Sequence, residues 1–101
     1  MELIVSNKVA DKIQDVHGVD VVEVEEAFFL LGNGHLIKDR RKKNKTNPDT
    51  VWFISETLAG RLLKVVIVPF FKDGYAVLRT AYEPDDEEIA FYEAFSEEND
   101  S

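Results

Sequence analysis

Apolar residues recur at helical spacing near the start of the chain, after a short alternating stretch at residues 2–6 that is typical of an edge strand. Val9, Ile13 and Val16 occupy positions i, i+4 and i+7, so they share one face of a predicted helix. Gly18 is the residue at which this helix is expected to end. The pattern therefore predicts a strand followed by an amphipathic helix.

A second helix is predicted to follow at once, because Asp20 and Glu23 have the spacing of a capping box. Its apolar stripe consists of Val24, Ala27, Phe28 and Leu31. Gly32 and Gly34 then mark its end. Two consecutive helices are therefore expected in the N-terminal part of the chain.

Strand signals dominate the middle of the chain. β-branched and aromatic residues are concentrated at 50–57, 61–71 and 75–82. A shorter strand or strand end is expected at 35–39, and a polar loop that contains Asn47-Pro48 follows it. These stretches predict an antiparallel meander of about four strands.

The hairpin between the last two strands decides which side chains face the helices. A two-residue turn at Asp73-Gly74 would place Lys64 opposite Glu83. One face would then carry Leu63, Val65, Ile67, Leu78 and Thr80 against the helices, and the other would carry Lys64, Val66, Val68, Val77, Arg79 and Ala81. A three-residue turn, or a bulge at Pro69, would change this register. In the two-residue register, Lys64 and Arg79 share the less buried face.

The last predicted element is a helix from Pro84 to about Phe95, whose acidic first turn is favoured by the helix dipole. Its apolar stripe is Ile89, Tyr92 and Phe95. The acidic run at 83–88 is interpreted as the solvated face of this helix, because it lacks the strict spacing of a cation site.

The order β-α-α-β-β-β-β-α indicates an α+β fold with two N-terminal helices, an antiparallel meander and a C-terminal helix. Residues 1–95 are expected to form a single domain, and residues 96–101 an acidic disordered tail.

Charge is distributed unevenly along the chain. The formal net charge is -8, yet residues 1–82 carry eleven acidic and twelve basic side chains, and the other nine acidic residues follow them. This acidity argues against indiscriminate nucleic-acid binding. A basic segment contains six cations, namely Lys38, Arg40, Arg41, Lys42, Lys43 and Lys45. It could contact phosphate or a partner, or it could be a solvated loop that offsets the acidic C-terminal helix.

The residue types exclude several classes of chemistry. Without cysteine there is no disulfide, thiolate nucleophile or cysteine zinc site, which fits a reducing compartment, and we expect a cytoplasmic protein. The apolar runs are too short for a membrane span, and the N-terminus lacks the pattern of a signal peptide. His17 and His35 have no acidic partners at ligand spacing, so no metal site is predicted, and no cofactor motif is present.

Two cations on an open sheet face indicate a candidate phosphate site. Lys64 and Arg79 could hold the phosphates of RNA on either side of a scissile bond, because guanidinium and ammonium groups pair with phosphate oxygens. Equally, Arg79 and Lys64 could form surface ion pairs with Glu83 and Glu56, respectively. Charge placement alone leaves both interpretations open.

Four stretches of the chain together resemble the BrnT-type toxins, small bacterial proteins akin to the RelE and ParE toxins: HGV at 17–19, EVEEAF at 23–28, WFISETLAGRLLKVVIV at 52–68 and TAYEPDDEEIAFYE at 80–93. The resemblance covers nearly the whole chain and depends on the common order and spacing of its motifs. Those motifs are a His-Gly-Val turn between two helices, Gly60-Arg61 before a Val-rich strand, and Tyr92-Glu93 in the last helix.

The resemblance implies a metal-independent endoribonuclease that inhibits translation and is neutralised by a cognate antitoxin of the ribbon-helix-helix type. RNA would be the substrate, and Arg61, Lys64 and Arg79 would position and neutralise its phosphate. Tyr82 or His17 would assist proton transfer at the ribose 2′-hydroxyl. Where the family has Ser-Ala-Arg this chain has Thr-Ala-Tyr ending at Tyr82, so Arg79 is the nearest candidate for that arginine. The basic segment would hold RNA or receive an acidic antitoxin segment.

Two alternatives use the same scaffold. A catalytically silent module would dock a partner protein, or hold RNA, through residues 38–45, and Tyr82 in place of arginine together with the acidic net charge favours this alternative. A toxin directed at gyrase would share the architecture with a different target. A homo-oligomer is compatible with each of these functions.

Overall fold

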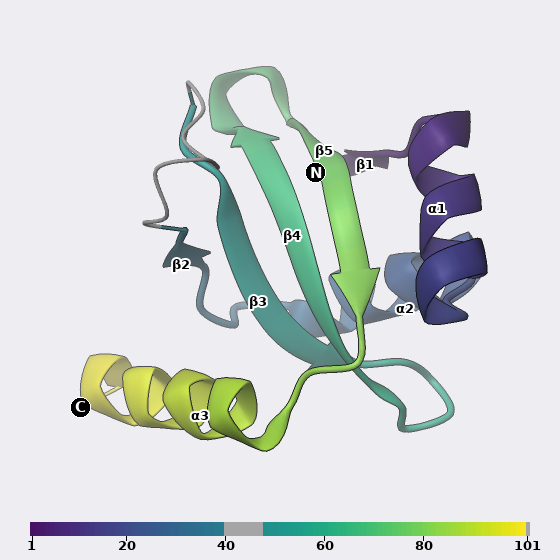
Figure 1. Ribbon diagram of the computed structural model, residues 1–101. Coiled ribbons are helices and arrows are strands. Elements are labelled where there is room, and N and C mark those ends of the chain that lie inside the picture. Colours follow the sequence, from purple (N-terminus) through teal and green to yellow (C-terminus); the bar gives the residue numbers. More distant parts are fainter. Residues whose placement is uncertain (40–47, 101) are drawn as a thin grey trace.

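The computed structural model describes residues 1–39 and 48–100 and contains one mixed sheet with three helices (Figure 1). In chain order the elements are β1 (Glu2–Ile4), α1 (Asn7–His17), α2 (Val21–Leu31), β2 (Ile37–Lys38), β3 (Val51–Glu56), β4 (Leu62–Phe70), β5 (Tyr75–Tyr82) and α3 (Asp86–Asp100). A single 3-10 turn at Phe71–Asp73 joins β4 to β5. The predicted α+β fold and its order of elements are confirmed.

The five strands lie in the order β1-β5-β4-β3-β2. All neighbouring strands are antiparallel except β1, which pairs with β5 in parallel. β1 is therefore the edge strand that the N-terminal alternation predicted. The pairing of β4 with β5 brings the start of one strand next to the end of the other, and the candidate site lies at that end of the sheet.

Neighbouring side chains of β3 point to opposite faces of the sheet and contact different helices. Phe53 is fully buried, and its ring centroid lies 6.3 Å from that of Phe28 in α2. The ring of Trp52 instead lies 6.0 Å from that of Phe91 and 5.8 Å from that of Tyr92, both in α3. Because strand side chains alternate between faces, α2 and α3 cover opposite faces of the sheet.

The main core lies between the sheet and the two N-terminal helices. Its fully or nearly fully buried members are Ile13, Val19, Val24, Ala27, Val51, Phe53, Leu63, Val65, Ile67, Ala76, Leu78 and Ala81. α3 contributes no fully buried residue, and it packs through its predicted stripe of Ile89, Tyr92 and Phe95, which are half-buried. α3 is therefore attached to the sheet less extensively than α1 and α2.

The turn between α1 and α2 explains one error in the predicted core. α1 ends at Gly18, which has a φ of 63°, and the capping box of Asp20 and Glu23 starts α2, both as predicted. Val16, which was predicted to face the core, is 64% exposed. The left-handed Gly18 folds the chain back, so that Val19 fills the core at this end of α1 instead.

The β4–β5 hairpin does not have the two-residue turn predicted at Asp73-Gly74. Phe70 pairs with Tyr75, so residues 71–74 form a longer loop that Gly74 completes with a φ of 76°. The rings of Phe70 and Tyr75 stack with their centroids 4.8 Å apart, and this contact stabilises the pair that closes the longer loop.

A bulge between Val66 and Ile67 shifts the register a second time. Lys64 consequently lies opposite Tyr82 rather than opposite Glu83 as predicted. Arg79 falls at the bulge, has no partner across the strand pair and is exposed. The shared open face predicted for Lys64 and Arg79 is therefore lost at the bulge.

The same bulge exchanges Thr80 and Ala81 between the two faces of the sheet. Ala81 lies opposite Val65 and is fully buried in the main core, whereas Thr80 lies opposite Val66 on the side of α3. This is the reverse of the predicted assignment, because one inserted residue reverses the alternation of every residue beyond it.

α3 extends to Asp100, so residues 96–100 are helical instead of the predicted disordered tail. No glycine or proline interrupts this part of the helix, and Asn99 Nδ2 donates a hydrogen bond of 2.8 Å to the carbonyl of Phe95. Asp100 Oδ1 lies 2.7 Å from His35 Nε2, which ties the last turn to the segment before β2. Ser101 lies outside the described residues.

Candidate functional site

The residues predicted to act on phosphate gather at one end of the sheet, with the exception of Arg79. Lys64 and Tyr82 are direct partners in the β4–β5 pair. His17 ends α1 beside Tyr82, and Arg61 lies just before β4. We name this group the end cluster, and it includes the carboxylates that contact those side chains, which belong to Glu23, Glu83 and Glu88.

Lys64 is held in a closed setting of aromatic rings and one carboxylate. Its Nζ lies 2.6 Å from Glu88 Oε2, and its side chain is only 9% exposed. The same Nζ lies 4.5 Å from the ring centroid of Trp52 and 5.5 Å from that of Tyr82. The rings and the carboxylate together favour the ammonium form and orient it toward α3.

Glu88 connects this ammonium to the start of α3. Its Oε2 also accepts a hydrogen bond of 3.2 Å from the hydroxyl of Tyr82. Its Oε1 accepts a hydrogen bond of 3.0 Å from the backbone N–H of Asp85. The Asp85 carboxylate in turn accepts a hydrogen bond of 2.8 Å from the backbone N–H of Glu88. This reciprocal capping fixes Glu88 in the first turn, and Glu88 in turn docks α3 on the sheet.

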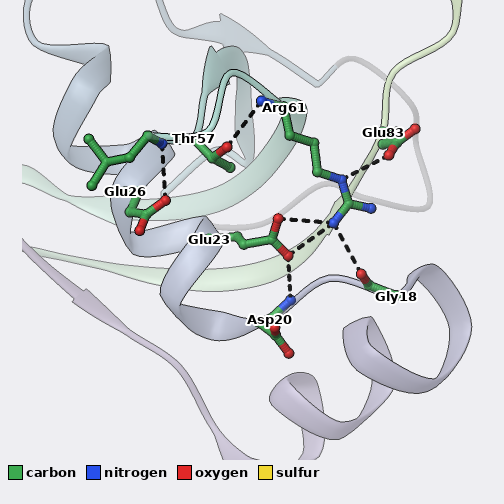
Figure 2. Close-up of polar contacts among 8 residues, drawn as sticks. Gly18, Asp20, Glu23, Glu26, Thr57, Arg61 and Glu83 are labelled. Carbon is green, nitrogen blue, oxygen red and sulfur yellow. Dashed lines mark hydrogen bonds and ion pairs between the residues drawn. The ribbon is translucent and has the colours of Figure 1, made fainter.

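Arg61 binds the other two carboxylates and joins four segments of the chain (Figure 2). Its Nη1 donates to both oxygens of Glu23, at 2.9 and 3.1 Å, and to the carbonyl of Gly18 at 3.1 Å. Its Nε donates to Glu83 at 2.8 Å. The turn before β4 positions this arginine, because the Arg61 N–H donates to Thr57 Oγ1 at 3.1 Å.

His17 and Tyr82 bring two further ionisable rings to the end cluster. Their centroids lie 5.3 Å apart with an interplanar angle of 39°. His17 is half-buried in the last turn of α1, and its neighbour Gly18 supplies the carbonyl that Arg61 binds. The imidazole, the phenol and the carboxylate of Glu88 are the groups here that could move a proton.

Arg79 and Lys38 make no contact with the end cluster. Arg79 is exposed at the bulge, and its guanidinium makes no hydrogen bond or ion pair with any residue that the structure describes. Lys38 Nζ lies 3.5 Å from Asp49 Oδ2, and both side chains are exposed. The remaining predicted contact residues lie outside the described residues, namely Arg40, Arg41, Lys42, Lys43 and Lys45.

The ion pairs expected as an alternative to phosphate binding are present with other partners. Lys64 pairs with Glu88 rather than Glu56, and Glu83 pairs with Arg61 rather than Arg79. Glu88 could have been recognised as a structural residue, because it follows Asp85 at capping-box spacing. Its contact with Lys64 depends on where α3 docks, and local sequence carries no signal for that.

Burial and ion pairing act on the pKa values of the Lys64–Glu88 pair in opposite directions. Burial would raise the pKa of Glu88, but hydrogen bonds from Lys64, the Asp85 backbone and Tyr82 outweigh it, and this pKa lies below its usual range. Burial likewise disfavours the charged form of Lys64, yet the bond to Glu88 holds the pKa of Lys64 above its usual range. Both groups therefore remain charged at neutral pH.

Glu23 and Arg61 are also fixed in their charged forms. The backbone N–H of Asp20 lowers the pKa of Glu23, and Arg61 lowers it further against the opposing effect of burial. The bond to Glu23 raises the pKa of Arg61. With two cations against three carboxylates, the end cluster has a negative formal charge. A phosphodiester would therefore have to displace the Glu88 carboxylate before Lys64 could bind it, and at Arg61 it would be repelled by the carboxylates of Glu23 and Glu83.

Acid is expected to weaken this network. The pKa values of Glu23 and Glu88 are depressed in the folded protein, so their stabilisation is complete above the ordinary value of 4.5 and is lost as the pH falls below it. We expect the free energy of unfolding, measured with urea from about pH 7 to about pH 3, to fall at the acid end. Glu88→Gln should flatten this decline and Glu87→Gln, at an exposed position of the same helix, should leave it unchanged. An identical pH profile in Glu88→Gln would contradict the assignment.

Comparison with models of known protein families and with curated proteins gives no match for this chain. Within residues 1–39 and 48–100, no helix is both long and apolar enough to cross a membrane. In the same residues, no group of three or more histidine, aspartate or glutamate side chains is arranged to hold a metal ion. The α+β fold and the end cluster are therefore the features from which a function can be inferred.

Proposed function

We propose that this chain is a catalytically silent binding module on a scaffold similar to that of the BrnT-type toxins, and that it docks a partner protein in the bacterial cytoplasm. The observation that supports this is the occupation of both site cations by carboxylates of the same chain. A ribonuclease needs cations that are free to take up the charge of the transition state. In this chain those cations hold α2 and α3 to the sheet instead.

The basic segment is the docking surface in this proposal. It places six cations in a chain with a net charge of -8, so an acidic segment of a partner would be attracted to this one region and repelled by most of the rest. Lys38, the member that the structure describes, is exposed and has only a long contact to Asp49. The partner occupies the role that the resemblance assigns to an antitoxin.

Charge reversal in the basic segment tests this proposal. We expect that changing residues 40–43 from Arg-Arg-Lys-Lys to glutamate abolishes co-purification with the product of the neighbouring reading frame. A matched control reverses four cations elsewhere on the surface, namely Lys8, Lys12, Lys72 and Arg79, and it should retain the complex. Equal loss in both variants would show that the effect is one of net charge, and retention in both would remove the docking role.

A metal-independent endoribonuclease is a second candidate, favoured by one observation. Tyr82 lies between the His17 ring and the Glu88 carboxylate, with Lys64 alongside, so groups for proton transfer and for charge neutralisation are adjacent. If RNA displaced Glu88 from Lys64, this arrangement could act on a ribose 2′-hydroxyl.

An RNA cleavage assay separates the two candidates. With end-labelled RNA, EDTA and the purified chain, we expect no cleavage above the buffer rate, because the end cluster repels phosphate. Growth of a bacterial host that expresses the chain alone should likewise be normal. Cleavage that disappears in both Lys64→Met and Tyr82→Phe would replace the first proposal with the second.

A further inference from the structure

An open groove of about 580 Å³ lies between the C-terminal end of α2 and α3, and no residue of the end cluster lines it. Its apolar lining includes Leu31, Ile54 and Ile89, which are buried or half-buried. Leu30 and Leu62 also line it, and they are 46% and 36% exposed. The groove thus presents apolar surface that no described element of the chain covers.

The charges around this groove are of one sign. Glu56, Glu93 and Asp100 belong to its lining, which contains no lysine or arginine. Asp100 is paired with His35, whereas the exposed carboxylates of Glu56 and Glu93 make no hydrogen bond or ion pair with any described residue. Uncompensated carboxylates therefore stand beside apolar side chains in one concave surface.

We propose that this groove binds a basic amphipathic segment of a partner protein. Apolar side chains of that segment would cover Leu30, Leu62 and Ile89, and its lysine or arginine side chains would pair with Glu56 and Glu93. An amphipathic helix presents such groups on one face at positions i, i+3, i+4 and i+7. The apolar side chains of the groove would then be covered, and its carboxylates would be paired with cations, by one segment.

Charge and shape argue against the other occupants. RNA or an acidic segment would be repelled by the unpaired carboxylates. A second copy of the chain brings its own net charge of -8, and its basic segment, residues 38–45, contains no apolar side chain to cover the leucines. A small polyamine would neutralise the carboxylates but would leave the exposed leucines in water. The inference goes beyond the proposed function, because no lining residue of the groove belongs to the basic segment and the two are opposite in charge.

A peptide titration of the full-length, ¹⁵N-labelled chain tests the proposal. The probe is a synthetic helical peptide of about 15 residues with leucine on one face and lysine on its flanks, and its matched control carries glutamate in place of lysine. We expect amide shift changes confined to groove residues such as Leu30, Ser55, Leu62 and Ser96, and no binding of the glutamate peptide.

Paired charge variants give the quantitative criterion. Glu56→Gln/Glu93→Gln should raise the dissociation constant of the lysine peptide by about tenfold, since two exposed ion pairs are lost. Glu25→Gln/Glu87→Gln removes the same charge from exposed helix positions outside the groove and should change it by less than about twofold.

Four results would overturn the groove proposal. The first is that both double variants bind the lysine peptide equally weakly, and the second is that amide shift changes spread over the whole acidic surface. The third is that spermine binds as tightly as the peptide at the same residues. The fourth is that the amide shifts of the groove depend on protein concentration when no peptide is present. Each would point to non-specific attraction, a small cation or self-association instead. None of them depends on residues 40–43, so the docking role of the basic segment is tested separately.

Discussion

Replacing Glu88 with alanine is expected to lower the free energy of unfolding by about 2–3 kcal/mol. The variant leaves the Lys64 ammonium in place, 9% exposed and without the carboxylate that lies 2.6 Å away in the parent chain. The rings of Trp52 and Tyr82 still face the ammonium, but a cation–π contact contributes only about 0.5–2 kcal/mol. Urea unfolding followed by the fluorescence of Trp52 measures the loss.

Two further variants separate the ion pair from the capping box that Glu88 also completes. Asp85→Ala removes the half of the cap that the Asp85 carboxylate makes and leaves the Lys64–Glu88 contact, so it should cost about 1 kcal/mol. Lys64→Met/Glu88→Leu removes both charges and should recover most of the loss, because apolar replacement of a buried pair is often close to neutral. If the double variant is as unstable as Glu88→Ala alone, the unpaired ammonium is not the cause.

The Lys64–Glu88 pair also relates the stability of this chain to its proposed function. Lys64, one of the cations that would hold a phosphate, also helps to hold α3 on the sheet, because α3 has no fully buried residue of its own. RNA binding at Lys64 would therefore compete with the docking of α3. A chain that keeps α3 in place keeps this site closed to phosphate, which is the physical basis for proposing a silent module.

Local signals were sufficient for the helices and for the order of elements. Asp20 and Glu23 form the predicted capping box, and Gly18 takes the left-handed conformation that ends α1. These features involve residues that are close in sequence, so spacing alone determines them. The β-branched and aromatic content of the middle of the chain likewise predicted β3, β4 and β5.

The register between β4 and β5 could not be predicted from local sequence, because it depends on contacts between residues that are far apart in the chain. The bulge beside Val66 and the longer loop closed by Phe70 and Tyr75 depend on how two strands fit together, and both changed the partner of Lys64. The alternation of side chains between the two faces of a strand correctly placed Lys64 and Val66 on one face of β4. The bulge breaks this alternation in β5, so the same rule could not place Arg79. Of the carboxylates in the end cluster, the sequence therefore indicated only Glu83 as an ion-pair partner, and with a different cation.

Replacing Phe53 with alanine is expected to be the most destabilising single change considered, at about 3–5 kcal/mol. Phe53 is fully buried in the central strand β3, and it contacts Phe28 of α2. Truncation removes a large apolar side chain and leaves a cavity between the sheet and α2 that the closely packed surroundings fill only in part. Thermal and urea unfolding should both report the loss, with α1, α2 and the sheet unfolding together.

Trp52→Ala is the matched control, because it truncates the neighbouring side chain on the opposite face of the same strand. Trp52 contacts Phe91 and Tyr92 and covers the ammonium of Lys64, so its removal should act mainly on α3. We expect faster amide hydrogen exchange in α3 in this variant, with protection of β3, β4 and β5 largely retained. Since Phe53 faces the main core and Trp52 faces α3, equal acceleration of exchange in all elements of both variants would contradict the assignment of the helices to opposite faces.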